Sequence, residues 1–414
     1  MNHPVKTLAA FAILGVLAPT AHAVSIKDDI VSLTPTVRIQ TRAQMNDANN
    51  TTGGDYRVAG GTAGASDEPI DFSLRRARMG LAFKYGSNWK GQFTVMADNV
   101  DQAANNTNRA INIRYGWLER SFALQDGMAA AVKFGLDKSE QNPTDRLSSS
   151  RKLLPNDNAS SGYLAPRGVG IGARFHHPIF MIAADLQNNT NAAKDVTTTA
   201  TTTNATEEEG YYYGIRAEFS FSSEWFITKR ADSFLGKEGQ GFNIGLSYGV
   251  NADAVLVDAD ASTAGNQQGH QSLAAYNVDA MLWLNGLSAF AEYRAGTVES
   301  TRNDGVSVPT SATTGPEVDA EFITIQLGYA FLIGEEVLEP AIRYQIIDNN
   351  SDADETVNYG NNTETGASGT QIDLGLNYYL SGHDNKLSLA VSLWEAEEGQ
   401  ADATIVRLQH QINF

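Results

Sequence analysis

The sequence predicts an all-β protein, a transmembrane antiparallel β-barrel of about 16 strands with long extracellular loops and short periplasmic turns. Three observations predict this fold class. The N-terminus has a secretory pattern, side chains alternate with a period of two, and long connections alternate with short ones. The chain has 414 residues and no cysteine, which excludes disulfides, zinc–thiolate sites and cysteine nucleophiles.

Residues 1–23 have the pattern of a signal peptide. MNHPVKTLAAFAILGVLAPTAHA combines one lysine, an apolar run from Leu8 to Leu17 and the small-residue motif Ala21-His22-Ala23. The apolar run is too short for a permanent membrane helix. We therefore expect residues 24–414 to form one barrel domain in the bacterial outer membrane.

From Ser32 onward the apolar residues recur at every second position. Phe242, Ile244 and Leu246, for example, alternate with Asn243 and Gly245. This alternation is typical of strands with one apolar face. Segments of this kind, each near the length that a tilted strand needs to cross a bilayer, are predicted at residues 33–45, 72–85, 89–99, 110–121, 128–137, 167–175, 179–187, 211–221, 241–250, 272–284, 287–296, 320–331, 337–347, 370–380, 386–395 and 404–414.

The connections between these segments alternate in length. Most short ones are tight turns such as Gly86–Asn88 and Asn285–Gly286. The long ones are residues 46–71, 100–109, 138–166, 188–210, 251–271, 297–319, 348–369 and 396–403. A soluble β-sandwich would also have alternating strands, but it would not have this asymmetry of the connections. The asymmetry therefore favours an outer-membrane barrel. One connection departs from the pattern, because 222–240 falls where a short turn is expected.

A basic wall is predicted on the lumen side of the first five strands. The stretch FSLRRARMGLAFKYG is rich in arginine although the net charge of the chain is −18. If the apolar face meets lipid, the other face meets the lumen. The basic residues with lumen parity are Arg38, Arg42, Arg76, Arg78, Lys84, Lys90, Arg114 and Lys133, against the acids Asp98 and Asp137. Arg75 has the opposite parity, so we expect it at the loop end of its strand, near lipid headgroups.

Such a wall has two interpretations. Rows of arginine and lysine select anions, and the forked donors of arginine suit phosphate-like oxyanions. Alternatively, the basic side chains pair with acids and only stiffen the barrel. The scarcity of acids on these strands favours the first interpretation.

The third long loop, residues 138–166, is a candidate constriction. It carries the basic residues Arg146, Arg151 and Lys152. The sequence leaves two possibilities open, a loop folded into the pore and a solvated external loop. Other long loops are acidic, and an acidic mouth would repel the anions that a basic wall attracts.

No metal site, cofactor or enzymatic activity is predicted. Residues 348–359 resemble a calcium-binding loop, but Ala353 and Tyr359 stand where glycine and glutamate are required. The five histidines after residue 23 have no nucleophile or metal-ligand partner at a suitable spacing. The acidic net charge argues against a nucleic-acid partner.

One protein family resembles parts of this sequence. FSLRRARMGLAFKYGSNWKGQFTVMAD, INIRYGWLERSF, AAAVKFGLDKSE and the closing stretches NYYLSGHDNKLSLAV and IVRLQHQINF resemble the phosphate-selective porin O and P family, most closely over residues 72–140. The resemblance implies a sixteen-stranded, homotrimeric porin that passes anions. Residue by residue it reaches Arg75, Arg76 and Arg78 of the shared motif.

The leading hypothesis is therefore an outer-membrane porin for passive diffusion of small solutes, with anions such as phosphate preferred. Its expected partners are small anionic solutes, outer-membrane lipid and lipopolysaccharide. Two alternatives stay open: a general or cation-preferring porin governed by acidic loops, and a surface barrel with a structural or adhesive role. A sugar-specific porin is less favoured, since lumen-side aromatic residues are scattered.

Overall fold

The computed structural model describes residues 26–27, 30–48, 70–100, 111–141, 143, 150–162, 167–188, 211–221, 226, 232–233, 235, 239–257, 268–302, 317–348, 368–397 and 402–414. The predicted signal peptide and Arg146 of the third long loop lie outside these residues. None of the helices in the described ranges is long and apolar enough to span a membrane.

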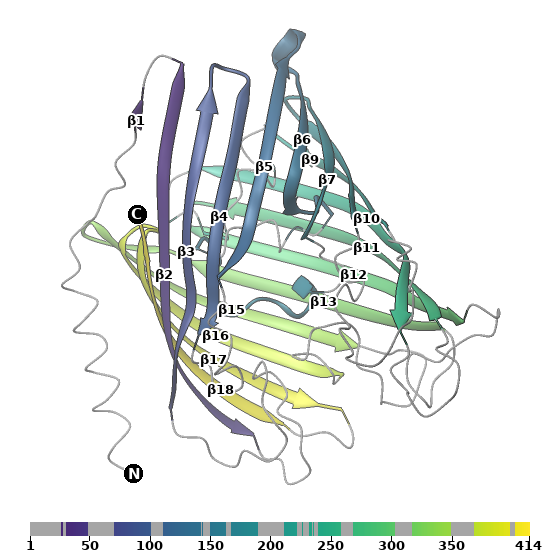
Figure 1. Cartoon of the computed structure of the whole chain (residues 1–414). Helices are drawn as coiled ribbons and strands as arrows, with labels where there is room; N and C mark the ends of the chain where they lie inside the picture. Colours follow the sequence, from purple (N-terminus) through teal and green to yellow (C-terminus); the bar gives the residue numbers. More distant parts are fainter. Residues whose placement is uncertain are drawn as a thin grey trace, which may run out of the picture.

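The described strands form a closed antiparallel ring (Figure 1). Each pairs with the next, and the last, β18, pairs with β2. In chain order they are β2 (Val31–Ala48), β3 (Asp71–Tyr85), β4 (Trp89–Val100), β5 (Asn112–Ala123), β6 (Ala129–Lys138), β7 (Arg167–His176), β8 (Phe180–Asn188), β9 (Tyr211–Ser220), β10 (Gln240–Val257), β11 (Gln268–Leu284), β12 (Leu287–Arg302), β13 (Glu317–Tyr329), β15 (Glu336–Asp348), β16 (Gly369–Ser381), β17 (Asn385–Ala396) and β18 (Ala403–Asn413). The predicted barrel is confirmed, and every predicted segment corresponds to one of these strands.

Four short elements complete the described secondary structure. β14 (Phe331–Ile333) continues β13 alongside β15, and β1 (Ile26–Lys27) pairs with the start of β2. The helical turns are η1 (Gln125–Gly127) and η2 (Ala159–Gly162). The tight turn Asn285–Gly286 has φ of 44° and 93°. Positive φ at both positions is the type I′ geometry that joins twisted antiparallel strands, which is why an Asn-Gly pair occurs there.

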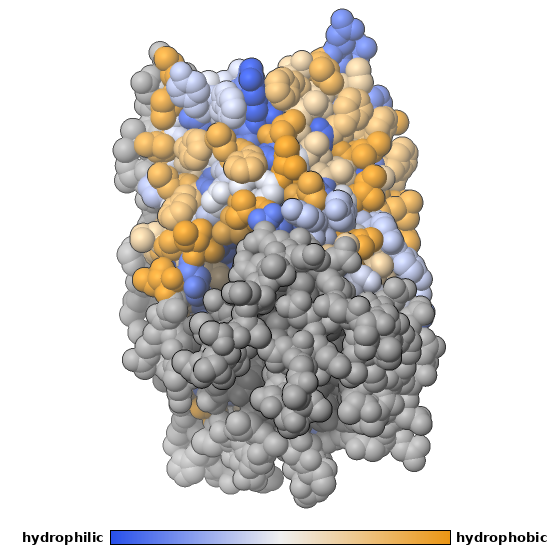
Figure 2. All heavy atoms as spheres, turned by 45° about the vertical axis from the view of Figure 1, so that its right-hand side comes forward, coloured by the Kyte–Doolittle hydropathy of each residue, from blue (hydrophilic) through white to orange (hydrophobic). Residues whose placement is uncertain are grey.

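The two faces of the wall differ as the alternation predicts. Along β9 the residues alternate between exposed and buried, with Ile215 exposed and Arg216 completely buried. The same holds for Leu246 and Ile325 on the outside of β10 and β13. Figure 2 shows many apolar residues on the outer surface of the strands in that view. An apolar exterior around a polar interior is the pattern of a barrel whose outside contacts lipid.

Two β-bulges interrupt the alternation, and each adds an arginine to the lumen. Between β2 and β3, Gln40 pairs with Arg76 and Thr41 with Leu74, so Arg75 is the extra residue. Between β4 and β5, Thr94 pairs with Tyr115 and Val95 with Ile113, so Arg114 is extra. An inserted residue reverses the inside–outside parity of the strand beyond it.

The bulges correct one sequence-based assignment and account for the position of a second residue. Arg75 does not lie near headgroups, because its guanidinium is 4.0 Å from Asp157 inside the barrel. Glu119, which simple alternation from Arg114 would turn outward, is a buried lumen residue. Strict alternation misplaces both residues because a bulge cannot be recognised from the period alone.

Deletion of Arg75 is expected to leave a folded barrel, because removing the extra residue keeps Ser73 and Arg76 facing inward. Ala77 pairs regularly with Ile39 and Ala97. Its deletion is expected to exchange the lumen-facing and lipid-facing side chains on one part of β3. An arginine forced onto the lipid face costs about 2–4 kcal/mol. Heat-modifiable electrophoretic mobility after refolding into lipid measures the difference. Equal loss of folding in both variants would contradict the bulge assignment.

The unusually long connection between β9 and β10 hides no further strand among its described residues. Asn243 of β10 pairs directly with Ser220 of β9. Phe226, Asp232 and Ser233 are buried. Of its described residues, Asp232 bonds with Arg151 and Leu153 of the third long loop.

Candidate functional site

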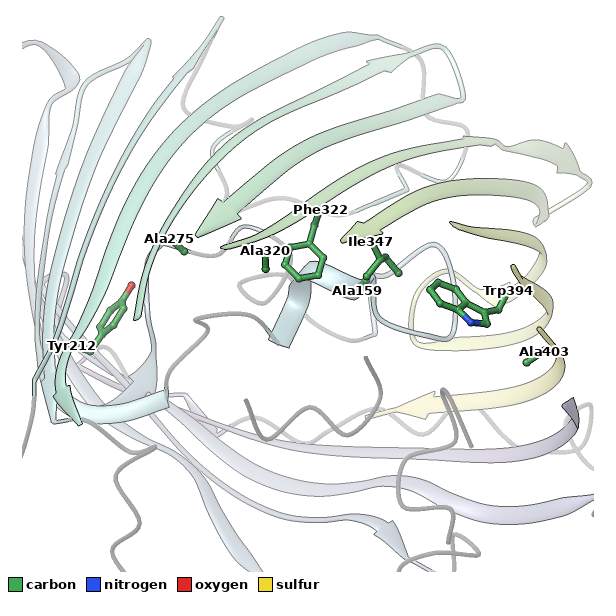
Figure 3. Packing of buried hydrophobic residues seen from close by; sticks show 8 residues of the cluster. All are labelled: Ala159, Tyr212, Ala275, Ala320, Phe322, Ile347, Trp394 and Ala403. Atoms are coloured by element: carbon green, nitrogen blue, oxygen red, sulfur yellow. The ribbon is translucent and has the colours of Figure 1, made fainter. Parts of the chain in front are cut away.

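The third long loop folds into the barrel. We call its described residues (139–141, 143 and 150–162) the inner loop. Leu153 and Leu154 are 1% and 2% exposed and pack on Ala341 and Ala390 of the wall. Figure 3 shows Ala159 of the inner loop inside the ring of strands, near Phe322 and Ile347. Of the two possibilities left open by the sequence, the inward fold is correct.

Small residues on the wall make room for these leucines. Gly328, Ala341, Gly375 and Ala390 are paired in succession across β13, β15, β16 and β17. We call this set the small-residue row. A Cβ atom at Gly328 would lie 2.7 Å from Cδ2 of Leu153, and one at Gly375 would overlap Leu154. With contacts this close, a side chain at either glycine would force the facing leucine side chain to shift.

Hydrogen bonds fix the inner loop to the same side of the barrel. Asn377 donates to the Leu153 carbonyl at 2.6 Å, and Lys386 donates to the Lys152 carbonyl at 2.6 Å. Further along, Ser160 donates to Glu292 at 2.6 Å. Buried polar groups with partners of this kind hold one conformation. The loop is thus anchored on β12 to β17.

The lumen is filled unevenly. Lumen-facing side chains of the strands from β9 to β17 are at most 3% exposed at Tyr212, Arg216, Glu218, Asn243, Asn277, Asp279, Glu292, Arg294, Thr324, Glu339, Gln345, Asp373, Asn377 and Ser388. On β3 and β4, by contrast, Lys84 is exposed and the Lys90 side chain is 46% exposed. The Arg78 side chain is 8% exposed, and Arg76 and Thr94 are each 5% exposed. On β3 and β4, the most exposed of the basic lumen side chains therefore lie beside the Gly86–Asn88 turn.

Six basic side chains meet two acids at this wall. The basic cluster consists of Arg38, Arg75, Arg76, Arg78, Arg114 and Lys152, with the acids Asp98 and Asp157. Asp98 accepts from Arg78 and lies 3.6 Å from Arg114. Asp157 pairs with Lys152 and lies 3.5 Å from Arg76. Among the described residues, the cluster therefore holds more basic than acidic side chains.

Two pairs of like charges face each other directly across strands. Arg38 is paired with Arg78, and Lys84 is paired with Lys90. Like charges in directly opposed positions destabilise a sheet. Each pair also has an acid partner, because Asp98 accepts from Arg78 and Lys90 lies 2.8 Å from Glu119.

Elsewhere the lumen arginines are neutralised by acids. Arg216 contacts Glu218 at 2.6 Å and Asp279 at 2.7 Å. Arg343 pairs with Asp373 at 2.8 Å. These pairs are buried and lie outside the basic cluster. They fit the stiffening role that the sequence offered as the alternative.

The predicted basic residues therefore separate into groups. Arg38, Arg76, Arg78 and Arg114 come together in the basic cluster, joined by Lys152 of the inner loop. Lys84 and Lys90 lie next to the Gly86–Asn88 turn. Arg42 donates to the Pro155 carbonyl at 2.7 Å.

The remaining predicted residues lie apart from the cluster. Lys133 is buried and bonded to Asp137 and Glu140, so it belongs to the stiffening network. Arg151 is exposed on the inner loop. Sequence reasoning missed Arg75 and Asp157 as members of the cluster. The RRAR motif could have indicated Arg75, whereas nothing local to Asp157 predicts its contacts with β3.

The charge state of Asp157 is set by its basic neighbours. It lies in the inner loop, outside the membrane-spanning strands. Burial opposes ionisation, but the charges of Lys152, Arg76 and Arg75 outweigh it and hold the pKa of Asp157 well below its ordinary value. The contacts that Asp157 makes as a carboxylate are therefore fully present above about pH 4, the ordinary pKa, and are lost as the pH falls through the lowered pKa.

Replacement of Asp157 by asparagine is expected to increase any preference for anions, since it removes one of the two acids in the cluster. One unit charge in water-filled surroundings is worth about 1 kcal/mol, or roughly fivefold in the anion-to-cation permeability ratio. Zero-current potentials in a salt gradient measure that ratio. In the unmodified protein the contribution of Asp157 is expected to stay constant between pH 8 and pH 5. A ratio unchanged by the substitution would remove Asp157 from the solute path.

Comparisons with known proteins agree on the fold. No family model matches the sequence, and no curated protein matches it. The structure is similar to OmpT, an outer membrane protein of Vibrio cholerae, with a TM-score of 0.52, 10% identity, and coverage of 95% of this chain and 100% of that chain. A variant of OmpT that lacks loop L8 is similar with a TM-score of 0.55 and 10% identity, over 93% of this chain and 100% of that chain. OprB of Pseudomonas putida is similar with a TM-score of 0.50 and 13% identity, over 92% of this chain and 94% of that chain.

Identities this low carry information about the fold and no more. The chain has the fold of an outer-membrane β-barrel. The specific resemblance to the phosphate-selective porin O and P family is not confirmed by these comparisons and stays a prediction.

Proposed function

We propose that this protein is an outer-membrane porin, a water-filled channel for passive diffusion of small solutes that prefers anions such as phosphate. The observation that carries the proposal is the basic cluster, in which six basic side chains meet two acids among the described residues of the lumen. Positive charge concentrated along an aqueous path raises the local concentration of anions.

The chemistry of the cluster suits oxyanions. Five of its six basic residues are arginines, whose planar guanidinium groups present paired donors to phosphate oxygens. Three of them, Arg75, Arg76 and Arg78, belong to the motif that resembles the phosphate-selective porin O and P family. As part of the same proposal, the protein forms a homotrimer and contacts outer-membrane lipid and lipopolysaccharide. The proposal assigns no catalytic activity to it.

The test is a planar-bilayer recording of the purified protein across a KCl gradient. The zero-current potential is expected to have the sign of chloride selectivity. Inorganic phosphate added to the bath is then expected to reduce the chloride conductance by occupying the cluster. A potassium-selective sign would overturn the anion preference while leaving the porin assignment in place.

A second candidate is a general or cation-preferring porin, favoured by the net charge of −18. Acidic residues at the mouth would act through the long-range field, which salt screens over about 10 Å at 0.1 M. Selectivity for potassium that disappears in high salt would favour this candidate. Absence of any conductance would favour a structural or adhesive barrel.

A further inference from the structure

We infer that the connection between β9 and β10 is an internal strut that positions the inner loop, with Asp232 as the positioning residue. We call the described residues 226, 232–233 and 235 of this connection the strut. The positional part of this inference stands on geometry alone. Its consequence for selectivity rests on the proposed porin function.

The strut is anchored on nearly opposite sides of the barrel. Phe226 packs on Met181 of β8. Leu235 packs against a cluster made of Ala330, which lies between β13 and β14, Val337 of β15 and Tyr379 of β16. Six strands separate β8 from β16 in one direction around the ring and eight in the other. The described residues of the strut are thus anchored at two distant places on the wall.

Between these anchors the strut meets the inner loop. The backbone N–H of Asp232 donates to the Arg151 carbonyl at 3.1 Å, and the Asp232 carboxylate accepts from the Leu153 N–H at 3.1 Å. Asp232 is 7% exposed and the neighbouring Ser233 is 1% exposed. A buried carboxylate that accepts a backbone N–H forms a charge-assisted bond, which is stronger than a neutral one.

The strut is itself fastened to the wall at this point. The Ser233 carbonyl lies 3.1 Å from Nε2 of His383, in the turn between β16 and β17. Residues 151–154 are consequently held from two sides, by Asp232 of the strut and by Asn377 and Lys386 of the wall. The strut therefore holds this part of the inner loop in position.

The strut affects the basic cluster through one residue of the inner loop. Lys152 lies between the two residues whose backbones bond Asp232, and its ammonium group pairs with Asp157. Asp157 in turn faces Arg75 and Arg76. If Asp232 releases residues 151–153, the position of Lys152 and Asp157 relative to β3 is no longer fixed.

The first test uses the absence of cysteine from the chain. A nitroxide spin label is attached to Arg151→Cys in the refolded protein. The mobility of the label is measured in this variant alone and after addition of Asp232→Ala, Asp232→Asn or Asp384→Ala. Asp232→Ala is expected to mobilise the label. Asn keeps an acceptor oxygen for the Leu153 N–H and is expected to preserve the immobile spectrum. Asp384, an exposed acid of the β16–β17 turn, serves as the matched control.

An immobile label in Asp232→Ala would overturn the inference, as would equal mobilisation by Asp384→Ala. This readout does not depend on conduction, so its failure is distinct from failure of the porin proposal. Bilayer recordings of the same variants add the functional consequence, an increase in open-channel noise with Asp232→Ala alone.

A second measurement needs no substitution. In the unmodified protein the Leu153 amide is expected to exchange with solvent at least about a hundredfold more slowly than an unstructured amide, because its acceptor is a buried carboxylate. Exchange at the unstructured rate would overturn the bond to Asp232, even if the Asp232→Ala variant does not fold.

Discussion

Replacing both Arg38 and Arg78 by glutamine is expected to remove most of the anion preference of the channel. The two residues are paired directly across β2 and β3. Glutamine retains a hydrogen-bonding side chain of similar reach and removes only the charge. Asp98 keeps Arg114 as a basic neighbour at 3.6 Å, so no acid is left isolated.

The expected size follows from the charges removed. One unit charge at contact distance in water contributes about 1 kcal/mol to the stabilisation of a passing anion, so the pair contributes about 2 kcal/mol at most. The anion-to-cation permeability ratio is therefore expected to fall by up to roughly thirtyfold. The zero-current potential in a KCl gradient measures this fall, and binding of inorganic phosphate is expected to weaken in parallel.

Arg120→Gln is the matched control. Arg120 is an exposed arginine on the outer face of β5, stacked 5.3 Å from the Trp89 ring and 5.0 Å from the Phe122 ring. The Arg120→Gln variant removes one unit charge, half of the charge that the Arg38 and Arg78 replacements remove together, without touching the lumen. An equal loss of selectivity in this variant would show that net charge, rather than the basic cluster, determines the preference.

The sequence predicts the barrel because each strand carries its own signal. An alternating segment such as Phe242–Tyr248 needs no information from elsewhere to be recognised as a strand with one lipid-facing side. The face of each arginine follows from the same parity, which is why Arg38, Arg76 and Arg78 were correctly assigned to one wall. The assignment of Arg75 was wrong, since a single inserted residue reverses parity without changing composition.

The inner loop could not be placed from the sequence for a different reason. Its contacts join residues far apart in the chain, such as Leu153 with Gly328 and Leu154 with Gly375. Each glycine taken alone reads as an ordinary small residue on the lumen face of a strand. Their function becomes visible only when strand pairing sets them in register with Ala341 and Ala390.

Substitution of Gly375 by valine is expected to displace the inner loop from the small-residue row and to increase single-channel conductance. The Cβ atom alone overlaps Leu154, and the branched methyl groups add further volume against it. Overpacking of this kind costs about 1–3 kcal/mol. That cost competes with the anchoring of the loop, while the β16 backbone keeps its pairs to both neighbouring strands. Heat-modifiable mobility is therefore expected to stay normal.

A compensating pair separates displacement of the loop from damage to the strand. Leu154→Ala combined with Gly375→Val restores the volume between loop and wall, so this double variant is expected to recover the original conductance. Gly116→Val adds the same atoms where no heavy atom lies within 4 Å of the new Cβ, and it is expected to leave conductance unchanged. If Gly375→Val left conductance unaltered, the inner loop would not limit the flow of ions. If the double variant stayed as conductive as Gly375→Val alone, the contact between Leu154 and Gly375 would not be what holds the loop in place.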